Sequence, residues 1–182
     1  MFLFKNRTFA FVLMLAVIIA ATLISSRNAL SDLASEAENV FYNGENNSTL
    51  SIQNDLSERI KLARNLTTLA QNYISPTDVL ITDVQAAADE LFAAKTINGK
   101  YASNKKLSDK VTVLYSELER YNLSSRDASY RAGLYNDFNS RQSTISHDPY
   151  NTYVAKYNDV LSAFPANILS KLSGLKKLEY FN

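Results

Sequence analysis

Apolar side chains recur at steps of three and four residues along most of this chain, which is the spacing of one face of an α-helix. Four such stripes follow residue 50, and they cover residues 52–73, 80–94, 107–121 and 134–164. No segment shows the strict alternation of a half-buried β-strand. The pattern predicts an all-α fold in which the four stripes form the core of an antiparallel four-helix bundle.

Turn-forming residues set the expected helix boundaries. Residues 30–41 already follow helical spacing, and NGENNS (43–48) separates them from the stripe that begins at Ile52. We expect these two segments to form one interrupted helix. In the segment 75–78, Ser75 is expected to cap the second helix and Asp78 to supply an acidic residue in its first turn. Asn98-Gly99 is expected to end that helix. The first and last helices of the bundle are then long and the middle two short.

A continuous apolar run, FAFVLMLAVIIAATLI, occupies residues 9–24. With its small flanking residues the segment 8–26 is long enough, at about 1.5 Å per residue, to cross a hydrocarbon core of about 30 Å. A cleaved signal peptide shares the positive start and the apolar run, but a small-x-small cleavage site is hard to find here. We therefore predict a retained transmembrane helix at 8–26.

The cations beside this run predict its orientation. Lys5 and Arg7 precede it and only Arg27 follows it, and the flank with more cations tends to stay in the cytoplasm. We expect a short cytoplasmic segment at 1–7 and a single-pass protein of the cell membrane. The helical-bundle domain at 27–182 is then expected outside the cytoplasm.

The composition narrows the function classes further. The chain has 182 residues with a formal net charge of +1, so it offers no basic stripe for nucleic acid. Its 4 Gly and 3 Pro suit long helices better than many short strands. It has no Cys, which excludes thiol catalysis, disulfides and thiolate metal sites.

Candidate catalytic chemistry is sparse. His147 is the only histidine and stands beside Asp148, but the polar stretch around it supplies no fixed nucleophile for a Ser-His-Asp arrangement. A glycine-rich phosphate loop, an HExxH pair and an EF-hand loop are all missing from the sequence. We predict no catalytic residue, no cofactor, no metal site and no identifiable small-molecule substrate. The protein is therefore expected not to be an enzyme.

The pair Tyr-Asn occurs twice near the end of the chain, at 150–151 and 157–158. Tyr150 and Tyr157 share one helix face with the neighbouring apolar residues, in a heptad seam typical of coiled coils that also includes Tyr153, Val154, Val160, Leu161 and Phe164. Asn151 and Asn158 lie one position round the helix, where they are expected to bond to a neighbouring helix. Asp148 either caps a restarted helix with Pro149 at its first position, or Pro149 kinks one long helix.

A break follows this seam. Pro165 disfavours helical dihedral angles at Phe164, so the long helix should end there. A short helix to about Leu172, closed by Gly174, is expected to follow.

This ending resembles the LemA family of membrane-anchored bacterial proteins. YNTYVAKYND followed by FPANILSKLSGLKKLEYF matches its two Tyr-Asn pairs, its Phe-Pro, its Gly and its terminal Tyr-Phe. RIKLARNLTTLAQNYI (59–74) is similar to the end of that family's first helix. The chain departs from the family with Arg64, where a Pro is usual, and with His147, where an Arg is usual. The resemblance implies one anchor followed by a helical bundle, and it implies no established catalytic activity.

The tail allows two interpretations. Lys171, Lys176 and Lys177 alternate with the apolar residues Ile168, Leu169, Leu172, Leu175 and Leu178. In one interpretation the apolar residues enter the membrane interface while the lysines meet anionic headgroups. In the other, which the pattern favours, Leu172, Leu175 and Phe181 cap the open end of the bundle.

The sequence thus predicts a non-enzymatic, membrane-anchored helical bundle that acts as an adaptor or scaffold for other proteins of the cell envelope. The residues expected to form its interaction surface or to define the bundle are Tyr150, Asn151, Tyr157, Asn158, Phe164, Pro165 and Gly174. The alternative is an extracytoplasmic sensory module that binds a ligand and works with a separate signalling partner. That partner would be required because no second run is apolar enough to span a membrane.

Overall fold

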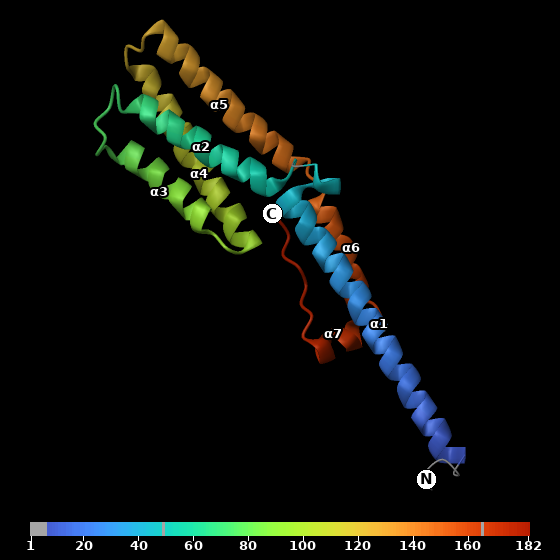
Figure 1. The fold of residues 1–182 in the computed structure, drawn as a ribbon. Coiled ribbons are helices and arrows are strands. Elements are labelled where there is room, and N and C mark those ends of the chain that lie inside the picture. Colours follow the sequence, from blue (N-terminus) through green and yellow to red (C-terminus); the bar gives the residue numbers. More distant parts are fainter. Residues whose placement is uncertain (1–6, 49, 165) are drawn as a thin grey trace. The chain divides into compact units, whose positions relative to one another are not determined.

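The computed structural model describes residues 7–48, 50–164 and 166–182. Within these residues the structure is all-α and contains no β-strand, as the sequence predicts (Figure 1). Its α-helices are α1 (Arg7–Asn43), α2 (Ile52–Ala70), α3 (Val79–Ala93), α4 (Ile97–Glu117), α5 (Ser125–Ser146), α6 (Tyr150–Ser162) and α7 (Ala166–Ser173). Two short 3₁₀-helices, η2 (Glu45–Asn47) and η3 (Leu118–Arg120), follow α1 and α4.

The first helix is long and apolar. It runs without a break for 37 residues, so the apolar segment and residues 30–41 form one continuous helix. An 18-residue segment of this helix has a mean hydropathy of 2.5, and none of that segment is buried within the protein. In length and composition α1 can therefore cross a membrane.

The structure divides into two compact units, and each combines two separate stretches of the chain. Unit 1 joins the chain up to Glu38 with Thr152–Leu178. Unit 2 joins Asn39–Asn151 with Glu179–Asn182.

Four helices form the bundle of unit 2. Helix α2 packs against α3 and α5, and α3 packs against α4. Figure 1 shows successive helices running in opposite directions with short connections between them, so the predicted antiparallel four-helix arrangement is confirmed. The predicted stripes supply the buried core residues, among them Ala63, Leu66, Val84, Leu91, Leu107, Leu114 and Phe138.

The break between α1 and α2 arises from left-handed backbone. Gly44 has φ 80°, and Asn46 and Asn47 have φ 55° and 57°. Glycine adopts such angles freely and Asn more readily than most residues. Ser51 then caps α2, because its hydroxyl accepts a hydrogen bond from the Asn54 N–H at 3.1 Å.

Two of the predicted helix boundaries are wrong. Asp78, and not Ser75, caps α3, because its carboxylate accepts a hydrogen bond from the Leu80 N–H at 2.9 Å. Asn98-Gly99 lies in the first turn of α4 and does not end α3, which stops at Ala93. Thr96 caps α4 by accepting from the Gly99 N–H at 3.0 Å. A Cβ at Gly99 would lie 2.8 Å from the Thr96 hydroxyl oxygen, so a larger residue would displace the hydroxyl that caps this helix.

Unit 1 has a small core of its own. Leu30 of α1 is buried with Tyr157 and Leu161 of α6, and the partly buried residues packed against them are Leu33, Ala34, Ala166, Leu175 and Leu178. The predicted seam of α6 is correct for its buried members but wrong for Val160 and Phe164, which are exposed. They lie in the last turn of α6 and just beyond it, where the helix has almost ended.

Candidate functional site

Helix α6 carries both Tyr-Asn pairs, and its start is fixed by Asp148. The Asp148 carboxylate accepts a hydrogen bond from the Tyr150 N–H at 2.9 Å, with Pro149 between them. Since α5 ends at Ser146, the helix restarts and is not one kinked helix. A proline at the first helical position loses no intrahelical bond. This cap places the first Tyr-Asn pair in the opening turn of α6.

In unit 2 the first pair holds the last residues of the chain. The Tyr150 hydroxyl donates to the Glu179 carbonyl at 2.7 Å. The Asn151 side chain bonds both backbone groups of Phe181: its amide donates to the carbonyl at 3.1 Å, and its oxygen accepts from the N–H at 2.8 Å. Every one of these bonds reaches backbone, so this pair recognises chain conformation and not side-chain identity.

A pocket for the Phe181 ring lies beside these bonds. The ring is only 7% exposed. Its centroid lies 5.3 Å from that of Tyr101, edge to face, and 6.0 Å from that of Phe41. The Glu179 carboxylate also accepts a hydrogen bond from the Asn98 N–H, at 3.0 Å, in the first turn of α4. Negative charge is favoured at a helix N-terminus. This part of the tail therefore favours an aromatic side chain at residue 181, which fills the pocket. It favours an acidic side chain at residue 179, which bonds the first turn of α4.

In unit 1 the second pair repeats the same pattern of bonds. The Tyr157 hydroxyl donates to the Lys176 carbonyl at 3.0 Å. The Asn158 amide donates to the Leu178 carbonyl at 3.1 Å, and its oxygen accepts from the Leu178 N–H at 2.9 Å. Burial raises the pKa of the Tyr157 hydroxyl above 10.0, so the hydroxyl remains a proton donor at neutral pH.

The spacing of the two pairs matches the spacing of the tail residues that they bind. Seven residues of α-helix rise about 10.5 Å at ~1.5 Å per residue, and three residues of extended chain advance about 10 Å. The tail positions bonded by the two tyrosines and by the two asparagines are each three residues apart. Each Tyr-Asn pair therefore binds its own segment of the tail, Glu179–Phe181 in unit 2 and Lys176–Leu178 in unit 1. The predicted bond from the asparagines to a neighbouring helix is wrong, because their partner is the tail.

The remaining singled-out residues have separate positions. Phe164 is exposed, and Pro165 lies outside the described residues. Gly174 has φ 70° and follows the last residue of α7, so it ends that helix as expected. Lys171, Lys176 and Lys177 are all exposed.

The tail's apolar residues have different surroundings. Leu175 packs on the core of unit 1, and Phe181 is buried in unit 2. Leu175 therefore covers apolar side chains of unit 1, and Phe181 covers those of unit 2. The side chains of Leu169 and Leu172 lie outside the described residues.

A buried arginine that was not singled out from the sequence forms a polar layer inside unit 2. Arg59 of α2 is 0% exposed and donates to the Asn104 side chain at 2.8 Å, to the Phe138 carbonyl at 2.7 Å, and to the Ser108 hydroxyl. Its guanidinium also lies 3.7 Å from the centroid of the Phe138 ring. A charged residue within an apolar stripe, one position before Ile60, was the sequence signal for this layer.

Burial shifts the pKa values of this layer. Desolvation lowers the pKa of Arg59 to about 10, so the side chain still carries its charge at neutral pH. Burial raises the pKa of the nearby Asp55 carboxyl, while an ion pair at 3.1 Å with Arg141 opposes that rise. All the donors of Arg59 named above have partners within the bundle. We therefore interpret this layer as a determinant of folding specificity.

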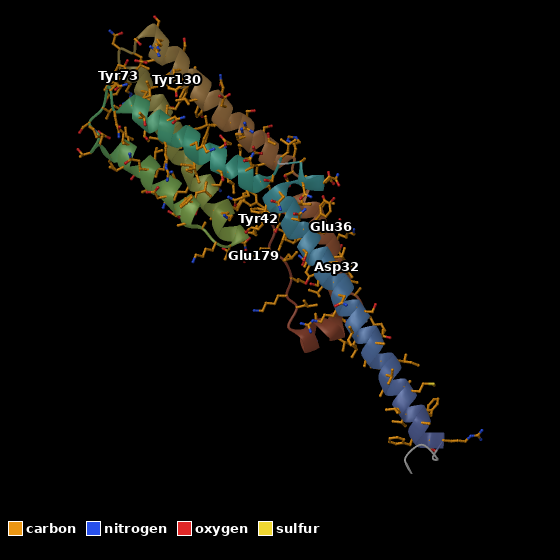
Figure 2. The ribbon with its side chains drawn as sticks, viewed as in Figure 1. Asp32, Glu36, Tyr42, Tyr73, Tyr130 and Glu179 are labelled. Atoms are coloured by element: carbon orange, nitrogen blue, oxygen red, sulfur yellow. The ribbon has the colours of Figure 1, made fainter. Side chains whose placement is uncertain are left out.

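An open hollow lies at one end of unit 2. Its volume is about 690 Å³, and its lining includes Asn65, Asn72, Arg126, Asp127 and Tyr130. Figure 2 shows Tyr73 and Tyr130 at this end. The Tyr73 hydroxyl donates to the Asp127 carboxylate at 2.5 Å, and this bond lowers the pKa of Asp127 below its ordinary value.

The only histidine lies at the end of α5. The His147 ring is exposed, and its Nδ1 is 2.8 Å from the Ser143 carbonyl oxygen. Among the described residues no group of three His, Cys, Asp or Glu side chains is placed to hold a metal ion.

A model of the LemA family matches residues 48–182 of this chain. The chain belongs to the LemA family. The resemblance drawn from the Tyr-Asn pairs, Phe-Pro and the terminal Tyr-Phe is thereby confirmed. A search of curated proteins finds no match. The matched region begins after α1, so it contains α2 to α7 and the whole tail but not the apolar helix.

Arg64 and His147, singled out above from the resemblance, both lie on the surface of unit 2. Arg64 forms an ion pair with Asp89 at 2.8 Å. His147 is the exposed residue at the end of α5 described above.

Proposed function

We propose that this LemA-family protein is a non-enzymatic adaptor or scaffold of the cell envelope, anchored in the membrane by residues 8–26. The observation that carries this proposal is the bonding of the two Tyr-Asn pairs. Their polar atoms hold the backbone of an extended chain through six hydrogen bonds, three from each pair. The chemistry of the site is recognition of a polypeptide.

Recognition of this kind suits a protein-binding role. An extended peptide that adds to a folded surface gains affinity from main-chain hydrogen bonds and specificity from side-chain pockets. Here the asparagines supply the main-chain bonds and the Phe181 pocket supplies the specificity. The chain's own tail is the segment bound in the structure, and segments of other envelope proteins with an aromatic residue are the proposed partners.

A peptide-binding measurement tests this proposal. The chain ending at Gly174, placed in lipid nanodiscs, should bind a labelled peptide with the sequence of residues 175–182. A matched variant with Asn151→Asp and Asn158→Asp should bind it much more weakly, because each change turns an amide donor towards a carbonyl into an acceptor. Fluorescence anisotropy measures both affinities, and circular dichroism checks that helix content is retained. Absence of binding by a chain with full helix content would contradict the proposal.

The proposed orientation places the N-terminus in the cytoplasm and both units outside it. It is supported by Lys5 and Arg7 before the apolar helix against Arg27 after it. Lys95 is exposed in the loop between α3 and α4, and the chain has no natural cysteine. A Lys95→Cys variant should therefore react with a membrane-impermeant maleimide on intact cells. Labelling only after lysis would place the units in the cytoplasm instead.

A sensory ligand-binding role is the second candidate, and the hollow of about 690 Å³ in unit 2 is the observation that favours it. Its polar lining, with Arg126 and Asp127 among other residues, suits a small polar metabolite. A thermal-shift screen of such metabolites tests this role, since a ligand at a hundred times its Kd stabilises by about 2.7 kcal/mol. A hit should disappear in Arg126→Ala. A screen without any such hit would leave the adaptor role as the proposal.

A further inference from the structure

Unit 1 exposes large apolar side chains near the end of α6. Phe164 is 79% exposed, Ile168 is 52% exposed and Val160 is 41% exposed. These residues lie close together in sequence: Val160 is in the last turn of α6, Phe164 is in the connection, and Ile168 is in the first turn of α7. A single exposed apolar residue is ordinary, but a group of this kind indicates an interaction surface.

An apolar groove of about 310 Å³ adjoins these residues. One wall comes from α1, with Ser26, Ala29 and Leu33, and the other comes from Val160, Phe164 and Ala166. Ser26 is also the last residue of the predicted transmembrane segment. The groove therefore begins on α1 where the segment suited to the hydrocarbon core ends.

The dimensions of a bilayer place this groove in the headgroup layer. The hydrocarbon core is about 30 Å thick and the whole bilayer about 40–45 Å, which leaves roughly 5–8 Å of headgroup region on each side. Ala29 follows Ser26 by about 4.5 Å along the helix axis, at ~1.5 Å per residue, and Leu33 by about 10 Å. The wall formed by α1 thus starts within the headgroup layer and ends just beyond it.

The charge of the same part of unit 1 suits an anionic surface. Residues 160–178 contain Lys171, Lys176 and Lys177 and no acidic residue. All three lysines are exposed, while Leu175 and Leu178 beside them pack on the core of unit 1. Asp159 immediately precedes this stretch, and Arg27 follows Ser26 on α1. A lysine near an anionic membrane contributes about fivefold to partitioning.

We propose that Val160, Phe164 and Ile168, together with Lys171, Lys176 and Lys177, form a juxtamembrane surface that binds the anionic phospholipids of the membrane spanned by α1. The apolar side chains enter the boundary between headgroups and acyl chains, and the lysines bind headgroup phosphates. This proposal rests on the anchoring that is part of the proposed function. It adds a second, lateral contact with the same membrane.

Fluorescence quenching in proteoliposomes tests the juxtamembrane surface. Because the chain has no cysteine, Phe164→Cys gives one site for an environment-sensitive label. Lipids with a quencher on the acyl chain should quench this label, and aqueous iodide should quench it weakly. The matched control is Phe92→Cys in unit 2, a phenylalanine of 74% exposure that should show the opposite behaviour. A label at residue 164 that iodide quenches as strongly as the label at residue 92 would overturn the proposal.

A label at Ile18→Cys separates this result from a failure of anchoring. Ile18 lies inside the predicted transmembrane segment, so lipid quenching there reports insertion of α1. Quenching at residue 18 without quenching at residue 164 would refute the juxtamembrane surface and leave the anchor intact. Absence of quenching at residue 18 would refute both.

The lysines are tested by a charge-matched pair of variants. Replacing Lys171, Lys176 and Lys177 by Gln should lower lipid quenching at residue 164 in vesicles rich in phosphatidylglycerol and change little in phosphatidylcholine vesicles. High salt should have the same effect, because it screens exposed charges. The control replaces the exposed Lys61, Lys95 and Lys105 of unit 2 by Gln. Equal quenching in both vesicle types would contradict the role of the lysines.

Discussion

Substitution of Asn151 by Asp should release the last four residues of the chain from unit 2. The two side chains have nearly the same shape, and both offer an oxygen to the Phe181 N–H. The Asn151 amide, however, donates to the Phe181 carbonyl at 3.1 Å, and an ionised carboxylate has no proton to donate. In the variant, a carboxylate oxygen of residue 151 therefore faces the Phe181 carbonyl oxygen. Two acceptors repel each other where the wild-type protein has a hydrogen bond.

The energies that hold these four residues exceed the cost of ordering them only slightly. Three hydrogen bonds to Tyr150 and Asn151 contribute roughly 3 kcal/mol. The bond from the Asn98 N–H to the Glu179 carboxylate adds about 2 kcal/mol. Burial of the Phe181 ring adds about 2 kcal/mol, and its aromatic neighbours add ~1 kcal/mol. Ordering four residues costs about 6 kcal/mol. Docking of Glu179–Asn182 is then favoured by only about 2 kcal/mol, and a loss of about 2 kcal/mol at one hydrogen bond should raise the open fraction roughly tenfold.

Amide hydrogen exchange at Phe181 measures this opening directly. The protein in nanodiscs is compared with the Asn151→Asp variant, in which exchange at Phe181 should be faster by roughly tenfold. Core amides of α2 should keep their protection, because the opening is local. Asn122→Asp makes the same change of charge at an exposed loop position and serves as the control. Unchanged exchange at Phe181 in the Asn151 variant would refute the conclusion that this side chain holds the Phe181 backbone.

Three further predictions concern stability. Arg59→Ala should lower the free energy of unfolding by about 3–5 kcal/mol in chemical denaturation, because it leaves the buried partners of the guanidinium unsatisfied; a loss below ~1 kcal/mol would contradict the buried layer. Gly44→Ala should lower Tm, since the added Cβ would lie 2.3 Å from the Leu50 carbonyl oxygen. Gly133→Ala is the matched control, because a Cβ added there has no atom within 4 Å. In the middle of α5 this change should raise the free energy of unfolding by about 0.5–1 kcal/mol. Burial raises the pKa of Asp148 above 3.8. The ionised carboxylate therefore destabilises the folded state at neutral pH, and this destabilisation disappears as the pH falls to 3.8 and below. Asp148→Asn, which can still cap α6, should therefore raise Tm at pH 7 but not at pH 3.5, and an equal gain at both pH values would contradict the shift.

The helices could be predicted from the sequence because their signal is local. Each stripe of apolar residues contains its own period, and α2 lies where its stripe places it. Helix α4 begins at Ile97, before its stripe does. The start of α3 was misplaced because Ser75 and Asp78 both offer a capping oxygen, and only the folded chain shows which one meets a free N–H. Gly99 resembles a helix end in sequence, yet it serves the opposite role beside Thr96. Capping signals of this kind are ambiguous over a few residues.

The partners of the candidate site could not be predicted because they are distant in sequence. The heptad spacing of Asn151 and Asn158 is visible in the sequence, but their partners lie 30 and 20 residues further on, in a tail without helical periodicity. Arg59 raises the same difficulty, since its partner Phe138 is 79 residues away. A periodic pattern indicates which side chains face inwards and leaves open what they meet there.

The discontinuous make-up of both units has a consequence for the synthesis of this protein. The ribosome produces the α1 half of unit 1 first and Thr152–Leu178 only after roughly a hundred more residues, which takes on the order of 5–20 s. Unit 2 in turn needs Glu179–Asn182, which are translated after the other residues of that unit. Helices α2 to α5 therefore leave the ribosome before the segment that fills their aromatic pocket. Until Phe181 is translated and docks, that pocket is open to chaperones and quality-control proteases.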